Sequence, residues 1–150
     1  MNREILFKAK RKDNGEWVKG YYVYDYSHDA HYIFANIIAT PNGVHDRRES
    51  FALEYYEIDP YTLCQYTGLT DKYGKEIWEN DIVKCLKRKE GYELYQVVWR
   101  NEFADFGVKP IKPKYGVKYP IGLSDGTTLN GYDYRALGDI FDNPELLEVR

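Results

Sequence analysis

Residues 65–83 read QYTGLTDKYGKEIWENDIV, a stretch that combines glycine bends with strand-forming residues. Gly68 allows the backbone to bend, and Asp71 stands three residues before Gly74, which is the spacing of a D-x-x-G turn. A second turn at 79–81 leads into Ile82-Val83. Because β-branched and aromatic residues favour strands, the stretch predicts short antiparallel strands joined by tight turns.

The same pattern continues toward both ends of the chain. Alternating aromatic and branched residues predict strands at 5–9, 17–24, 32–39, 51–58, 75–78, 82–86, 92–99 and 132–141. Asn14-Gly15 predicts the turn of a hairpin over residues 5–24, because both residues tolerate positive φ. Asp59-Pro60 predicts a single turn of helix with Asp59 as its cap.

The C-terminal half has the strand pattern of a small barrel. The strand at 82–86, a charged loop and a returning strand that ends at Trp99 are how many SH3-like barrels begin. Residues 101–131 contain three prolines, each of which removes a ladder donor, so we expect a long loop or an edge segment there.

The predicted fold class is all-β, mainly antiparallel. It has two packed β-rich parts, with an SH3-like small barrel in the C-terminal half, from about residue 76 to 147. We expect a single domain over residues 1–150, which can be subdivided into an N-terminal β part, 1–59, and a barrel-like part, 60–150.

Composition excludes several classes of protein. The chain has 150 residues, of which 16 are tyrosines. Its net charge of −3 does not favour a dedicated nucleic-acid binder, because such domains are usually basic. The charged N-terminus lacks a signal-peptide pattern, and no apolar run is long enough for a membrane helix. We expect Cys64 and Cys85 to be buried thiols in a reducing cytoplasm; a disulfide is the alternative.

Three parts of the sequence resemble the YopX family. Residues 58–83 are similar to its central motif, and residues 137–147, LGDIFDNPELL, to its closing motif. The opening segment, REILFKAK with WVKG after it, is similar to the family's start. Asn80 and Trp78 stand where glycine and tyrosine are usual, and both replacements suit the same turn and strand. The resemblance implies a β-rich, oligomer-prone protein of phages and prophages of Gram-positive bacteria, and it supplies no catalytic residues.

Two clusters of polar residues suggest chemistry. His28, Asp29, His31, His45 and Asp46 could converge on a metal if the intervening strand folds back; otherwise they are a solvated loop.

The second cluster is acidic. Glu76, Glu79 and Asp81 crowd one turn, where paired carboxylates could act as acid and base or hold Mg²⁺. The alternative is that these charges keep a hairpin tip soluble, with Asp71 and Gly74 setting the turn.

The best candidate for a binding surface is the hairpin of residues 84–99, where cations lie beside aromatic rings. Its members are Lys84, Lys87, Arg88, Lys89, Tyr92, Tyr95 and Trp99. Such a surface can engage phosphates and stack bases. The lysines at 109, 112, 114 and 118 would widen it if the following loop folds over the hairpin. The alternative is an ordinary solvated hairpin beside core aromatics.

We therefore expect a non-enzymatic phage or prophage accessory protein that acts through protein–protein contacts in the cytoplasm of its bacterial host. It would form a homo-oligomer anchored by exposed tyrosines, or bind a host or phage protein, without a cofactor. The alternatives are a nucleic-acid-binding module that uses the hairpin 84–99, and a metal-assisted hydrolase.

Overall fold

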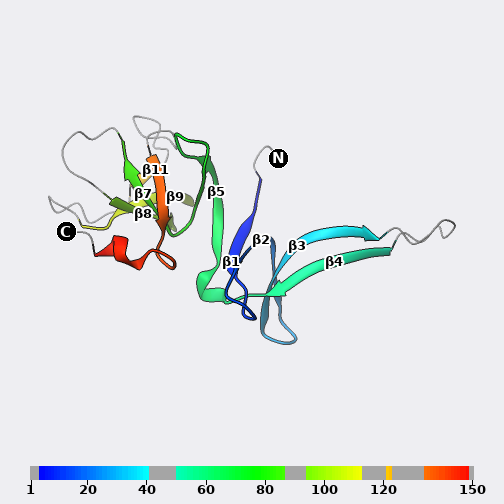
Figure 1. Cartoon of the computed structure of the whole chain (residues 1–150). Coiled ribbons are helices and arrows are strands. Elements are labelled where there is room, and N and C mark those ends of the chain that lie inside the picture. Colours follow the sequence, from blue (N-terminus) through cyan, green and yellow to red (C-terminus); the bar gives the residue numbers. More distant parts are fainter. Residues whose placement is uncertain (1–3, 41–49, 87–93, 113–120, 123–133, 149–150) are drawn as a thin grey trace. The chain divides into compact units, whose positions relative to one another are not determined.

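The computed structural model describes residues 4–40, 50–86, 94–112, 121–122 and 134–148, which fold into two compact units (Figure 1). One unit is Glu4–Gln65, and the continuous part of the other is Tyr66–Arg150. The described chain consists of strands in two antiparallel sheets, with short 3₁₀ turns at Pro60–Thr62 and Pro144–Leu147. The all-β, antiparallel prediction is confirmed.

The N-terminal unit is a sheet of hairpins with the strand order β4-β3-β2-β1-β5. Its strands are β1 (Phe7–Lys10), β2 (Trp17–Asp25), β3 (Ala30–Thr40), β4 (Ser50–Glu57) and the start of β5 (Cys64–Thr70). The Asn14-Gly15 turn joins β1 to β2 as predicted, and Gly15 has a φ of 73°. Before β5, the Asp59 side chain accepts a hydrogen bond from the Tyr61 N–H and caps the 3₁₀ turn, also as predicted.

Gly20 lies where β2 changes partner. Residues 17–20 of β2 pair with β1, and residues 21–25 pair with β3. A Cβ atom at position 20 would lie 2.0 Å from the carbonyl oxygen of Phe34, next to the bulge in β3. Only glycine lets the two backbones approach so closely.

The core of this unit lies on one face of its sheet. Ala9, Ile33 and Ile58 are fully buried there, and Phe7, Val18 and Leu63 pack against them. Because side chains alternate between faces along a strand, every second residue of β2, β3 and β4 points away from this core.

The C-terminal unit contains β6 (Glu76–Trp78), β7 (Asp81–Cys85), β8 (Leu94–Arg100), β9 (Asp105–Pro110), β10 (Ile121–Gly122) and β11 (Tyr134–Asp139). Five of these strands form a sheet of order β10-β9-β8-β7-β11, and β6 pairs with β5. Its core is made by buried side chains of β6, β7, β8, β9 and β11: Ile77, Val83, Cys85, Tyr95, Val97, Val108, Tyr134 and Ala136.

The SH3-like barrel is not observed. Closing a barrel requires the two end strands of a sheet to pair. In the described part of the chain, β10 pairs with β9 and β11 pairs with β7, so this sheet keeps two ends. The hairpin pattern of β7 and β8 is common to open and closed sheets, and it does not determine closure.

The segment 101–131 is also more regular than predicted, because it contains β9 and β10. The turn from β8 into β9 has no glycine or proline: Ala104 takes the positive φ of 51° that glycine would normally supply. Pro110 is the last residue of β9, where a missing N–H costs one ladder bond at most. Strand pairing with β8 outweighs these unfavourable local signals.

Asp71 joins the turn between β5 and β6 to β11. Its buried carboxylate accepts backbone hydrogen bonds from Tyr73 (2.8 Å), Lys75 (2.9 Å) and Ala136 (2.9 Å). Burial alone would raise the pKa of Asp71, but these three N–H donors stabilise the carboxylate and together lower the pKa below its ordinary value. The D-x-x-G turn is thus confirmed, with Gly74 at a φ of 81°.

Cys64 and Cys85 are both buried free thiols. No described helix has the length and apolar character needed to span a bilayer.

Asp71→Asn should destabilise the protein at pH 7 by about 3 kcal/mol, because an amide cannot accept all three backbone hydrogen bonds with equal strength. The pKa is lowered in the folded state, so the carboxylate stabilises the fold above its unfolded pKa of about 4. That stabilisation is lost as the pH falls through the folded pKa. Urea unfolding at pH 7 and pH 3 should therefore show a smaller difference between variant and wild type at pH 3; an equal difference would contradict this role.

Gly20→Ala should destabilise the protein by about 2 kcal/mol or more, because the new methyl group collides with the Phe34 carbonyl. Gly15→Ala is the matched control. Nothing lies within 4 Å of a Cβ at position 15, so that change adds only the cost of a left-handed alanine, about 1 kcal/mol. Thermal unfolding of the two variants measures the difference, and equal losses would rule out the close approach as the cause.

Candidate functional site

The face of the N-terminal sheet that points away from the core is lined with aromatic side chains. Directly opposite residues of antiparallel strands share a face. Tyr21, Phe34 and Tyr55 are opposite one another across β2, β3 and β4 and form one row. Val23 and Tyr32 begin a second row that ends at Glu57 of β4. We call Tyr21, Val23, Tyr32, Phe34 and Tyr55 the outer face.

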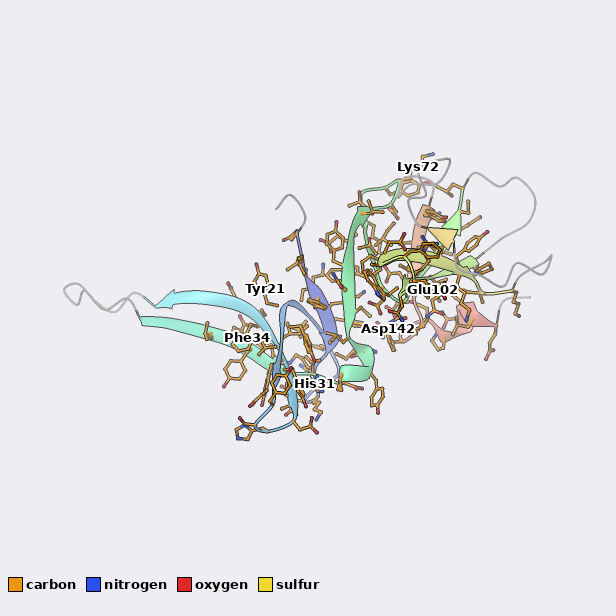
Figure 2. The ribbon with its side chains drawn as sticks, turned by 180° about the vertical axis from the view of Figure 1, so that it is seen from behind. Tyr21, His31, Phe34, Lys72, Glu102 and Asp142 are labelled. Carbon is orange, nitrogen blue, oxygen red and sulfur yellow. The ribbon has the colours of Figure 1, made fainter. Side chains whose placement is uncertain are left out.

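The rings of the outer face contact one another. Tyr55 stacks on Phe34 with ring centroids 5.2 Å apart, and meets Tyr32 edge-on at 5.8 Å. Tyr21 is nevertheless 64% exposed, Tyr55 54% and Val23 42%. Tyr21 and Phe34 lie on neighbouring strands in Figure 2. The outer face is thus an ordered aromatic surface that remains in contact with solvent, and contiguous exposed apolar surface of this kind commonly marks an interaction site.

The opposite, inner face uses aromatic residues differently. Tyr22, Ile33 and Tyr56 form the corresponding inner row. The Tyr22 hydroxyl lies 2.7 Å from Nδ1 of His31, and burial raises the pKa of Tyr22. Tyrosine therefore serves the core on one face of these strands and faces solvent on the other.

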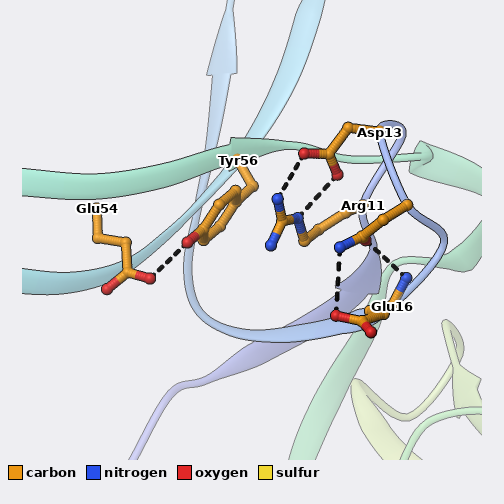
Figure 3. A network of polar contacts seen from close by, with 6 residues as sticks. Arg11, Asp13, Glu16, Glu54 and Tyr56 are labelled. Atoms are coloured by element: carbon orange, nitrogen blue, oxygen red, sulfur yellow. Dashed lines mark hydrogen bonds and ion pairs between the residues drawn. The ribbon is translucent and has the colours of Figure 1, made fainter.

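A polar network fixes β4 to the first hairpin (Figure 3). The guanidinium of Arg11 lies 3.7 Å from the ring centroid of Tyr56 and donates hydrogen bonds to Asp13. The hydrogen bond between Arg11 and Asp13 raises the pKa of Arg11 and lowers the pKa of Asp13. Tyr56 donates its hydroxyl hydrogen to Glu54, which raises the pKa of Tyr56. These contacts hold the inner half of β4 in register.

Two further acidic side chains, Asp81 and Asp139, accept backbone hydrogen bonds at turns. Asp81 accepts a hydrogen bond from the Trp78 N–H at 2.8 Å and so closes the turn before β7, with Asn80 at a φ of 67°. Asp139 accepts from the N–H groups of Phe141 and Asp142, both at 2.8 Å. Like Asp71, both carboxylates are buried and position backbone.

The other members of the two predicted polar clusters lie in separate settings. Glu76 is on β6 and Glu79 is in the turn after it. His28 pairs with Asp25 at 2.7 Å, Asp29 accepts from the Tyr24 hydroxyl, and His31 faces Tyr22. His45 and Asp46 lie outside the described residues. Within the described residues, no group of three or more His, Cys, Asp or Glu side chains is arranged to hold a metal.

The predicted binding hairpin is only partly described, and its described members are not on one surface. Lys87, Arg88, Lys89 and Tyr92 lie outside the described residues, as do Lys114 and Lys118. Val83 and Tyr95 are directly opposite and share the core face, so Lys84 points to the other face.

The two described aromatics of that hairpin lie on the core side of the sheet. Tyr95 is 3% exposed and packs edge-on against Tyr134, so its ring has no face for a ligand. Trp99 is 42% exposed and meets Phe106 edge-on at 5.0 Å. Trp99 and Lys84 therefore lie on opposite faces of the sheet. The sequence predicts that strand residues alternate between faces, but it does not show which face packs on the core.

A different cation and aromatic pair lies beside Lys84. Arg135 of β11 is directly opposite Lys84 of β7, so two like charges are neighbours on this face. The Arg135 guanidinium lies 5.5 Å from the ring centroid of Tyr73, which is 67% exposed. We call Lys84, Arg135 and Tyr73 the basic patch. Lys109 is exposed near the end of β9, and Lys112 donates to the carbonyl of Glu148.

The outer face was not identified as a surface from the sequence, although its tyrosines belong to the predicted strands. Every residue in 21–24 and in 32–34 is aromatic or aliphatic, so the sequence does not show which face of these strands points to the core. The register across β2, β3 and β4 was needed to find it.

The fold is similar to that of protein EF1440 from Enterococcus faecalis, known from a crystal structure, with a TM-score of 0.60 and 19% sequence identity. The match covers 97% of this chain and 99% of that one, and at this identity it shows the fold alone. No curated protein matches the sequence significantly. The YopX protein family model matches residues 6–148, which include the central and closing motifs and most of the opening segment, and it confirms the resemblance. The chain therefore belongs to the YopX family.

Proposed function

We propose that this chain is a non-enzymatic accessory protein of a phage or prophage, which acts in the bacterial cytoplasm through protein–protein contacts and associates with itself. The observation that carries the proposal is the outer face, whose row Tyr21–Phe34–Tyr55 leaves two tyrosines more than half exposed. Membership of the YopX family supports the phage setting.

An aromatic surface of this kind is suited to a protein partner. Tyrosine carries a large apolar ring with two side-chain torsions and a hydroxyl that stays hydrogen-bonded when the ring is covered. The mutual contacts of Tyr32, Phe34 and Tyr55 already restrict these rings, so less side-chain entropy is lost on binding. Interfaces commonly concentrate their binding energy in such anchors.

The use of the buried carboxylates supports a non-enzymatic role. A catalytic acid or base needs a lone pair or proton directed at a substrate. Asp71, Asp81 and Asp139 instead direct their oxygens at backbone N–H groups within turns. Free thiols at Cys64 and Cys85 are in keeping with a reducing compartment.

Tyr55→Ser should weaken self-association at least about tenfold, which corresponds to about 1.4 kcal/mol. The side chain is more than half exposed, so the monomer should lose little thermal stability beyond its ring contacts with Phe34 and Tyr32. Sedimentation equilibrium over a range of protein concentrations measures both the mass and the dissociation constant.

Tyr61→Ser is the matched control, because Tyr61 is 90% exposed and lies in the 3₁₀ turn, away from the outer face. A wild-type mass equal to the 17.7 kDa chain at all micromolar concentrations would reject self-association. Equal effects of the two serine variants would reject the outer face as the contact.

A second candidate function, binding of single-stranded nucleic acid, is favoured by one observation. Lys84 and Arg135 are directly opposite on neighbouring strands, so two cations lie close together on one face. Tyr73 beside Arg135 presents an exposed ring. Phosphate between the two cations and a base on the ring would make use of both features.

Arg135→Glu should weaken retention of a single-stranded oligonucleotide more than about tenfold at low salt, because it reverses one charge of the basic patch. Lys112→Glu makes a charge reversal of the same sign in the same unit and should have a small effect. Fluorescence anisotropy across a salt series measures the affinity. Absence of wild-type binding at low salt would eliminate this function.

A further inference from the structure

The outer half of the β3–β4 hairpin extends beyond the rest of its sheet (Figure 1). β2 pairs with β3 only as far as Phe34, and a bulge follows it. Beyond the bulge, Asn36–Thr40 pair with Ser50–Glu54, and in the described chain these two segments pair only with each other. We call this two-stranded ribbon the arm.

A ribbon of this kind has little stability of its own. An isolated two-stranded hairpin is marginal in water, because its strands lack the further pairing and the packed face that stabilise a sheet. The inner half of β4 is supported by Arg11 on Tyr56 and by the 2.9 Å ion pair of Lys12 with Glu57. The arm begins where these supports end.

The sequence of the arm lacks the features that normally protect an open strand edge. Natural edges carry lysine, proline or inward-pointing charges. The arm reads NIIAT and SFALE, and its only charged residue is Glu54, at the inner end. By contrast, 30% of the whole chain is charged. The open edge of the arm is therefore suited to hydrogen-bonded pairing with another strand.

We propose that the free edge of β4 in the arm pairs with the same edge of a second copy of this chain, so that the two arms form one continuous antiparallel sheet. Two identical strands related by a twofold axis in this way are necessarily antiparallel. This inference rests on the self-association in the proposed function and assigns its geometry.

The charge of the arm favours a second copy over another peptide. In a two-fold antiparallel contact, residue i of one strand lies opposite residue j of the other, and residue j lies opposite residue i, so any charge in the strand enters the interface twice. Ser50–Leu53 carries none, and the lone Glu54 lies at the inner end. The exposed Leu53, 50% accessible, continues the side of β4 that carries Tyr55, so pairing would also join the two outer faces.

The first test introduces a charge at the edge. Leu53→Lys should weaken self-association at least about tenfold, because a lysine on an edge strand opposes addition of another strand. Tyr61→Lys, at an exposed site outside the sheet, should leave it unchanged. Sedimentation equilibrium gives both dissociation constants.

The second test removes the arm. Ile37 and Leu53 are directly opposite, so replacing residues 38–52 by Asn-Gly closes the hairpin with a two-residue turn. This variant should be monomeric and keep the far-ultraviolet circular dichroism of a sheet protein. If it fails to fold, hydrogen exchange of the wild type decides: amides of 50–57 should become more protected as the protein concentration rises, whereas those of β8 should not change.

The outcomes separate this inference from the proposed function. A wild-type chain that stays monomeric rejects self-association altogether. A wild-type oligomer that Leu53→Lys and the trimmed hairpin leave intact, with exchange at 50–57 independent of concentration, overturns the arm alone and leaves the outer face as the contact.

Discussion

The register of β2, β3 and β4 is the constraint on which the candidate surface depends. Tyr21, Phe34 and Tyr55 become a row only because they are directly opposite across three strands. Gly20 allows β2 to approach the carbonyl of Phe34, and the bulge at Ala35 then shifts the pairing of the rest of β3. A slip of one residue would exchange the outer tyrosines with the buried inner row.

The C-terminal unit uses its charged residues to fix turns. Asp71, Asp81 and Asp139 lie within or next to the motifs that mark the family, and each is buried on backbone N–H groups. Gly138 has a similar role, because a Cβ there would lie 2.1 Å from Oδ1 of Asn143. The most distinctive residues of the sequence therefore specify the fold, and the surface is formed by residues that carry no motif.

The sequence correctly predicted the turns and caps that depend on a few adjacent residues. The Asn14-Gly15 turn, the cap at Asp59 and the D-x-x-G turn were found because each depends on a few adjacent residues. The strand β9 was missed because the three prolines of 101–131 favoured a loop, and because the turn before it uses Ala104, whose positive φ no glycine announces. The predicted barrel is wrong because closure of a sheet depends on pairing between strands far apart in the sequence. Tyr95 and Lys84 were assigned to one surface because the face on which each side chain lies also depends on strand pairing.

The outer face and the free edge of the arm both carry a cost for a protein that stays monomeric. An exposed aromatic row and an unprotected edge both favour unwanted association, and a monomeric protein gains nothing from keeping them. Replacing Tyr21 and Leu53 by polar residues, or placing a lysine in the arm, would remove that cost. The core would not be disturbed, because it lies on the other face of the sheet. The proposed self-association would cover both the aromatic row and the edge, and this burial would offset the cost of keeping them exposed.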